Sequence, residues 1–102
     1  MDSNELKEWK KYRKPSTAFN KCKVNELVIF PNNSYEHEKA KFDLYWKLRQ
    51  EGHNVLTECE LIETKERCDL VDLTGGGERY EIETDKKRAK RFEGRPINVI
   101  QL

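Results

Sequence analysis

The sequence is poor in the features that mark membrane, secreted and zinc-binding proteins. Only 35% of its 102 residues are hydrophobic, and the longest uncharged apolar run, residues 27–30, is far too short to span a bilayer. The three cysteines are an odd number and none form a C-x-x-C pair, which argues against a disulfide framework or a zinc site. No signal-peptide pattern opens the chain. We therefore expect no membrane contact and a reducing cytoplasm, that of a host cell if the protein is viral.

Charge is abundant instead, and it is unevenly distributed. Residues 1–23 hold seven Lys/Arg and three acids, residues 24–85 seven and fifteen, and residues 86–102 six and one, giving net charges of +4, −8 and +5. An acidic middle between basic ends is typical of a site that holds cations while its rims contact a polyanion. Chance segregation in a chain rich in lysine and glutamate is the alternative.

The apolar pattern predicts a single α/β domain with a mixed (α+β) sheet. We expect a first helix over residues 2–14, capped by Asp2 with Glu5, and a short strand over 26–30. The core, residues 35–102, then reads helix 35–51 capped by Ser34, strands 54–61, 68–73 and 78–84, a short basic helix 85–92 and a strand 97–102. A strand, crossover helix and strand in succession imply that the last strand runs parallel to an earlier one. Residues 1–34 are expected to form an N-terminal helix, connector and short strand.

The hairpin formed by residues 68–84 is predicted to gather carboxylates. Side chains alternate along a strand, so Asp69 and Val71 are expected on one face of the first strand. A loop made of the three glycines would then pair Val71 with Glu81 and Asp69 with Glu83. Asp69, Glu81 and Glu83 would then converge on one face. A two-residue loop would shift the register by one and separate them, so this prediction depends on the loop length.

Directly opposed carboxylates repel each other unless a cation lies between them. Carboxylate oxygens at this spacing suit Mg²⁺ or Mn²⁺, which take one or two carboxylates and keep other positions for water or phosphate oxygens. A metal so held can activate water for attack on a phosphodiester, and the following basic helix can contact the neighbouring phosphates. The alternative is a solvated strand face whose two glutamates pair with surface lysines.

The stretches EHEKAKFDLYWKLRQEGHNVLTECEL, CDLVDL and GERYEIET, followed by a helix and an apolar strand, resemble the PD-(D/E)xK nuclease superfamily. The likeness is closest to small archaeal and archaeal-virus members, and it covers residues 35–102. It implies a restriction-endonuclease-like core and a metal-dependent nuclease. By this resemblance Asp69 is the motif aspartate, Glu81 is the first acid of the E-x-K motif, and Glu83 stands where the motif lysine is usual. Some restriction endonucleases use Glu-x-Glu there.

Two substitutes for the motif lysine are visible. Lys41 falls at helical spacing with His37, Leu44 and Leu48, so that Lys41 and His37 are expected on the buried stripe of the main helix. Alternatively, the stem of Lys41 packs and its amine reaches solvent. The second substitute is the lysine pair that follows the hairpin, residues 86–87.

Further candidates surround these residues. Glu36 and Glu38 begin the main helix, where members of the superfamily carry an acid that orients metal-bound water, and Glu36 fits the resemblance better. A first-turn acid also simply favours the helix dipole. His37 is a candidate general base or a histidine satisfied under the sheet edge. Glu58 is a further metal ligand or a solvated strand residue.

The candidate nucleic-acid contacts lie in the two basic segments. They are Lys86, Lys87, Arg88, Lys90 and Arg91 after the hairpin, and Lys10, Lys11 and Arg13 around the aromatic residues of the N-terminal helix. Aromatic residues among basic ones can stack on bases while the cations contact phosphates. The alternatives are that the aromatic side chains pack on the domain with the lysines solvated, or that the segment forms a dimer contact.

Together these patterns predict a nuclease that uses Mg²⁺ or Mn²⁺ to hydrolyse DNA, or RNA, as a monomer or homodimer. The alternative is a nuclease fold without catalysis that binds nucleic acid or a protein partner. The missing motif lysine favours this second hypothesis.

Overall fold

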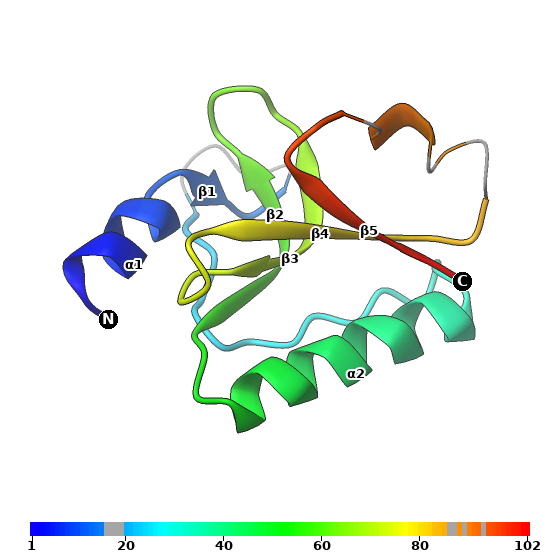
Figure 1. Ribbon diagram of the computed structural model, residues 1–102, viewed down its shortest axis with the longest axis horizontal. Helices are drawn as coiled ribbons and strands as arrows, with labels where there is room; N and C mark the ends of the chain where they lie inside the picture. The colour runs from blue at the N-terminus through cyan, green and yellow to red at the C-terminus, as the bar shows by residue number, and fades with distance from the viewer. Residues whose placement is uncertain (16–19, 86–87, 89, 93) are drawn as a thin grey trace.

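A five-stranded mixed sheet with helices packed on it forms the protein, as the predicted fold class requires (Figure 1). The computed structural model describes residues 1–15, 20–85, 88, 90–92 and 94–102. Its elements are α1 (Ser3–Trp9), β1 (Tyr12–Arg13), α2 (Tyr35–Gln50), β2 (Val55–Leu61), β3 (Arg67–Asp72), β4 (Glu78–Glu83), the 3₁₀ helix η1 (Lys90–Phe92) and β5 (Ile97–Gln101).

The strands lie in the order β1-β2-β3-β4-β5. Neighbouring strands are antiparallel except for β4 and β5, which run parallel. The prediction of a parallel last strand is therefore confirmed. In the predicted basic helix, the structure describes a 3₁₀ turn over Lys90–Phe92.

The N-terminal helix is shorter than predicted. Its capping box is present, since the Asp2 carboxylate accepts a hydrogen bond from the Glu5 amide (2.8 Å) and Glu5 accepts one from the Asp2 amide (3.2 Å). The helix ends at Trp9, however, and Tyr12 lies in β1 opposite Leu61, where only 2% of its surface is exposed. The prediction that the helix continues to residue 14 is wrong, because burying Tyr12 against the sheet stabilises the chain more than another helical turn.

Residues 26–30, predicted as a strand, form none. The Thr57 hydroxyl on β2 accepts a hydrogen bond from the Val28 amide (2.9 Å) and donates one to the Glu26 carbonyl (2.7 Å). The Asn25 amide donates to the Val55 carbonyl (2.8 Å), and the Asn25 side chain accepts from the Val55 amide (2.9 Å). Three of these four hydrogen bonds involve a side chain, so the segment is held without a backbone ladder. We call residues 25–28 the strap. It lies beside α2, since the Tyr45 hydroxyl donates a hydrogen bond to the Asn25 carbonyl (2.8 Å), and Figure 1 shows it along that helix.

Helix α2 follows the sequence closely. The Ser34 hydroxyl accepts a hydrogen bond from the His37 amide (3.1 Å), as the predicted N-cap requires. The helix ends at Gln50, one residue before the predicted end, and Gly52 beyond it has a φ of 81°. That conformation favours glycine and explains why the helix stops there.

The sheet has a hydrophobic cluster on each face. Between the sheet and α2 lie Leu48, Val55 and Leu70, with Leu44, Tyr45 and Tyr80 partly buried around them. The second cluster contains Tyr12, Cys22, Leu56, Cys59, Cys68, Val71 and Leu73, with Trp9, Val24 and Leu61 packed against it.

The three cysteines are all free thiols, and Cys59 lies opposite Cys68 across β2 and β3. Among the described residues, no helix is long and apolar enough to cross a membrane.

Candidate active site

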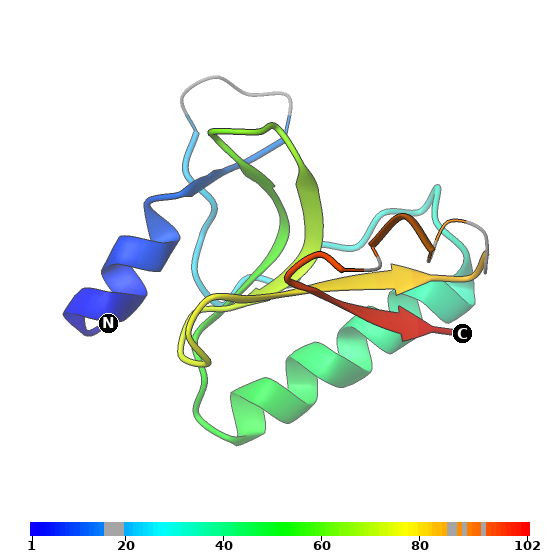
Figure 2. The same cartoon turned by 45° about the horizontal axis from the view of Figure 1, so that its top comes forward.

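The candidate site lies where β3 and β4 separate. These strands pair only over Leu70–Tyr80, Val71–Arg79 and Asp72–Glu78. Beyond Leu70, β3 turns away with β2 while β4 continues beside β5, as Figures 1 and 2 show. The carboxylate of Asp69 occupies the start of this fork, where it accepts a hydrogen bond from the Ile82 amide (2.7 Å).

The hairpin register differs from the predicted one by two residues, because the loop is longer than three glycines. The Asp72 carboxylate accepts a hydrogen bond from the Gly75 amide (2.9 Å) and lies 2.9 Å from His53 Nδ1. The Gly77 amide donates a hydrogen bond to the Asp72 carbonyl (2.9 Å). These contacts close a five-residue loop over residues 73–77. Val71 therefore faces Arg79 rather than Glu81, and Glu81 rather than Glu83 becomes the neighbour of Asp69.

A local distortion turns two acids toward α2. Leu56 and Cys59 belong to the same cluster although they are three residues apart, whereas strict alternation would place them on opposite faces. Glu58, between them, has a φ of 50°. The same change of face separates Val71 from Asp69 on β3, since Asp69 contacts α2 and Val71 packs in the opposite cluster. The prediction that Asp69 and Val71 share a face is wrong for this reason.

His37 links α2 to the fork. Its Nε2 lies 3.3 Å from the Asp69 carboxylate, and its Nδ1 lies 2.9 Å from Glu38 Oε1. Burial raises the pKa of Glu38, but hydrogen bonds from Lys41, Asn33, His37 and the Phe30 amide outweigh it and bring the pKa down to about 2. Glu38 is therefore a permanent anion that orients the His37 ring. His37 is not a free surface histidine.

Lys41 lies on the buried stripe of α2, as predicted, and its side chain has 0% exposure. Its ammonium does not reach solvent but lies 2.6 Å from Glu38 Oε2 and 2.7 Å from Glu58 Oε1. Burial raises the pKa of Glu58, although Lys41 opposes this effect. Glu58 is thus a buried partner of Lys41 and not a solvated strand residue. We call the series Glu58, Lys41, Glu38, His37 and Asp69 the polar chain.

Glu81 completes the acidic centre. Burial and the charge of Asp69 raise the pKa of Glu81 to about 9, so that protonated Glu81 donates a hydrogen bond to Asp69 at neutral pH. Glu83 is half-buried, and its carboxylate accepts a hydrogen bond from the Asp85 amide (3.1 Å). The two acids of the Glu-x-Glu motif therefore have different environments.

A pocket of about 310 Å³ joins these side chains. It is lined by Asn32, Asn33, Ser34, His37, Asp69, Glu81, Ile82, Glu83, Thr84 and Arg88. The structure thus brings together the three predicted acids, His37 and one predicted basic residue, Arg88. Lys41 and Glu58 do not line the pocket; they are joined to it through Glu38 and His37.

Other predicted site residues lie elsewhere. Glu36 is exposed on α2 and does not line the pocket, and the helix acid that contacts His37 is Glu38. Glu38 precedes Lys41 by three residues, and this helical spacing could have predicted their ion pair from the sequence. Asn33, which holds Glu38 (2.8 Å), was missed, because a turn asparagine carries no chemical signature.

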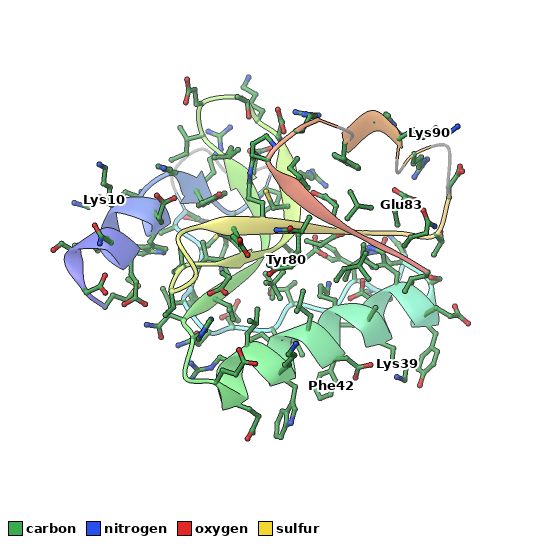
Figure 3. All side chains as sticks on the ribbon, in the orientation of Figure 1. Lys10, Lys39, Phe42, Tyr80, Glu83 and Lys90 are labelled. Carbon is green, nitrogen blue, oxygen red and sulfur yellow. The ribbon has the colours of Figure 1, made fainter. Side chains whose placement is uncertain are left out.

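The predicted nucleic-acid contacts fall into two separate groups. Lys90 and Arg91 are exposed on η1, and Figure 3 shows Lys90 and Glu83 at the same end of the molecule. Lys10 lies at the opposite end (Figure 3). Two residues near it already have partners, since Lys11 pairs with Glu8 (3.0 Å) and Arg13 with Glu60 (2.9 Å). Lys86 and Lys87 lie outside the described residues.

The pocket offers carboxylate oxygens as donors for a divalent cation. Within the part of the chain that the structure describes, no group of three or more His, Cys, Asp or Glu side chains is arranged to hold a metal ion. Asp69 and Glu81 lie side by side, with Glu83 on the same pocket. Mg²⁺ is commonly held by one or two carboxylates with water in its other positions. The pair Asp69 and Glu81 fits that mode.

Comparisons of the chain with protein-family models, with curated proteins and with solved structures found no match in any of the three.

Proposed function

We propose that the chain is a divalent-metal-dependent nuclease that hydrolyses phosphodiester bonds of DNA on a restriction-endonuclease-like fold. The observation that carries the proposal is the Asp69–Glu81 pair, in which two partly buried acidic side chains lie side by side at an open pocket and the pKa of Glu81 is raised to about 9. Such a pair is costly to the fold, and a strongly raised pKa in a pocket is typical of functional sites. The order α2-β2-β3-β4-β5, with β5 parallel to β4, supports the fold assignment.

Asp69 and Glu81 would hold Mg²⁺ or Mn²⁺, and Glu83 is within the same pocket to support them. When bound between these acids, a divalent cation would provide activation of a water molecule and charge neutralisation at the phosphate. Glu81 must lose its proton for this purpose, so the affinity for the cation is expected to rise with pH. At the position where the superfamily usually has a lysine, this chain has the acid Glu83.

The remaining residues of the pocket have supporting roles. His37 lies against the Asp69 carboxylate (3.3 Å), where it is the candidate general base. Lys41 acts as a positioning residue, because its ammonium is enclosed by Glu38 and Glu58. Among the described residues, Arg88 is the cation that lines the pocket and is placed to bind a phosphate.

The DNA backbone would approach from the end that carries η1. Lys90 and Arg91 are exposed there, on the segment that follows the acidic strand β4. The N-terminal cations lie at the other end of the molecule and do not extend the same surface (Figure 3). Arg88, Lys90 and Arg91 are therefore the preferred backbone contacts. The three free thiols are consistent with action in a reducing cytoplasm.

A second function is a nuclease fold that binds nucleic acid without cutting it. It is favoured by one observation: Lys41 is enclosed in an ion pair and Glu83 stands at the motif lysine's position. In that case the acidic pair would be a remnant of catalysis.

Cleavage of labelled single-stranded DNA, duplex DNA and RNA, with Mg²⁺, Mn²⁺ or EDTA, tests the proposal. Asp69→Asn and Glu81→Gln are expected to lower metal-dependent cleavage at least about 100-fold, since even groups that only support metal ligands cost 10–100-fold. The matched control is Glu78→Gln, because Glu78 is an exposed acid on the same strand outside the pocket. Its cleavage rate should equal that of the wild type.

Fluorescence anisotropy with Ca²⁺ in place of Mg²⁺ measures binding without turnover. Tight DNA binding with no cleavage under any metal would reject the nuclease and support the binding module. Cleavage that persists in both pocket variants would reject the assignment of the site.

A further inference from the structure

The outward face of α2 carries an aromatic stripe. Tyr35, Phe42 and Trp46 are 74%, 43% and 56% exposed, and their spacing of seven and four residues places them on one side of the helix. Phe42 and Trp46 stack with ring centroids 6.1 Å apart. Figure 3 shows Phe42 and Lys39 pointing away from the sheet. An exposed group of large aromatic side chains is typical of a contact surface.

Charges flank this stripe in a regular order. Glu36, Lys39, Asp43 and Lys47 are all exposed, at intervals of three and four residues, so they lie together on the helix surface. Their signs read minus, plus, minus, plus from the N-terminal end. Read in the opposite direction the signs are plus, minus, plus, minus. A second copy of this helix laid antiparallel therefore presents an opposite charge at every position, whereas a parallel copy presents like charges.

We propose that the outer face of α2 is a homodimer interface, in which two copies pair antiparallel about a two-fold axis near residues 41–42. Glu36 then faces Lys47 of the second copy. Lys39 and Asp43, which form an ion pair within each helix (2.9 Å), lie beside the same pair of the second copy in the reverse order. The aromatic residues meet on the neighbouring flank, with Phe42 close to the axis and Tyr35 beside Trp46 of the second copy. This self-complementary order favours a second copy of the chain over an unrelated partner.

The size of the contact sets the expected strength. A helix of 16 residues is about 24 Å long, and two such helices bury less surface than a standard interface. We therefore expect a dimer that dissociates in the micromolar range. The site pocket lies at the N-terminal end of α2, away from the axis, so the two pockets stay open at opposite ends of the paired helices. This inference does not depend on the proposed nuclease activity.

Sedimentation equilibrium over a concentration series to about 1 mM tests the interface. The variants are Glu36→Lys and Lys47→Glu, each alone and mixed in equal amounts. Each single variant places like charges opposite one another at both ends of the pair, and is expected to weaken association at least about tenfold. The mixture should recover it, because each chain then presents the charge that the other lacks.

Recovery cannot arise within one chain. Residues 36 and 47 lie 11 positions apart on the helix, about 16 Å along its axis, too far for a direct ion pair. Lys7→Glu on α1 is the charge-matched control, since Lys7 is exposed and distant in sequence from α2. Far-ultraviolet circular dichroism checks that every variant is folded. A wild-type chain that stays monomeric to about 1 mM, or a mixture that associates no better than its components, would overturn the proposal.

Discussion

At the scale of single residues, the most informative feature is that neighbouring acids titrate differently. Glu81 is protonated at neutral pH because it is partly buried beside Asp69, whereas Glu38 is ionised because four hydrogen bonds hold it. Glu38 belongs to the polar chain and Glu81 contacts its last member, Asp69. The same small region therefore contains one protonated and one ionised glutamate. That arrangement suits a site that exchanges a proton for a cation.

Glu81 should make the stability of the domain depend on pH. Its pKa rises from 4.5 to about 9 on folding, so the folded state binds the extra proton between these values. Stability from this group is complete below about pH 4.5 and is lost as the pH rises toward 9. Glu81→Gln removes the effect, and is expected to stabilise the domain by about 1–3 kcal/mol at pH 7 and hardly at all at pH 4.

Urea unfolding at pH 4, 7 and 9 in EDTA measures this difference. The exposed Glu78→Gln is again the control, and its unfolding free energy should follow the wild type at each pH. Parallel pH profiles for wild type and Glu81→Gln would show that Glu81 is ionised in the folded protein, against the description above.

At the residue scale, the sequence predicted which side chains lie together better than it predicted how they are arranged. Asp69, Glu81, Glu83 and His37 were predicted, and all four line one pocket. Which acid lies beside Asp69 was predicted wrongly, because the loop length depends on the Asp72 carboxylate binding the Gly75 amide. Such a side-chain contact leaves no periodic pattern in the sequence.

At the scale of elements, side chains decide where strands and helices stop. Alternation predicted β2, β3 and β4, but it could not reveal the change of face at Glu58, which arises from one backbone angle. Composition predicted a strand over residues 26–30. Instead, the Thr57 hydroxyl on β2 forms hydrogen bonds with the backbone of Glu26 and Val28, in place of strand pairing. At its C-terminal end the strap is therefore held by the Thr57 side chain, and at its N-terminal end by hydrogen bonds between Asn25 and Val55.

Thr57→Val should loosen the strap while preserving the shape of the side chain. It removes the acceptor of the Val28 amide and the donor to the Glu26 carbonyl, and we expect a loss of about 1–3 kcal/mol in unfolding free energy. Chemical denaturation measures the loss. Thr64→Val is the control, because the Thr64 hydroxyl makes one exposed contact of 3.3 Å with the Glu66 amide. Equal losses in both variants would contradict the importance of Thr57.

At the scale of the whole molecule, the polar chain joins the helical layer to the sheet. Lys41 on α2 is enclosed by Glu38 of its own helix and Glu58 of β2, within an otherwise apolar interface formed by residues such as Leu48 and Val55. The order of elements and the parallel last strand were predictable from local patterns. The ion pairs between layers were not, since they join residues 17 positions apart.

Lys41→Met should destabilise the domain strongly, by about 3–5 kcal/mol, because it leaves two buried carboxylates without their cation. Thermal and urea unfolding measure the change. Lys7→Met is the control on an exposed helical position, with an expected change within about 0.5 kcal/mol. A Lys41 variant as stable as the control would mean that the buried ion pairs contribute nothing to the fold.

The three buried thiols can serve as intrinsic probes of local and global unfolding. Cys59 and Cys68 lie on paired central strands, whereas Cys22 belongs to the connector that precedes the strap. A buried thiol reacts with an alkylating reagent only when the structure around it opens. The rate at which each cysteine is labelled therefore reports a different event: release of the connector for Cys22, and separation of the sheet for the other two. Mass spectrometry of the labelled chain can thus follow local and global unfolding separately, without any introduced probe.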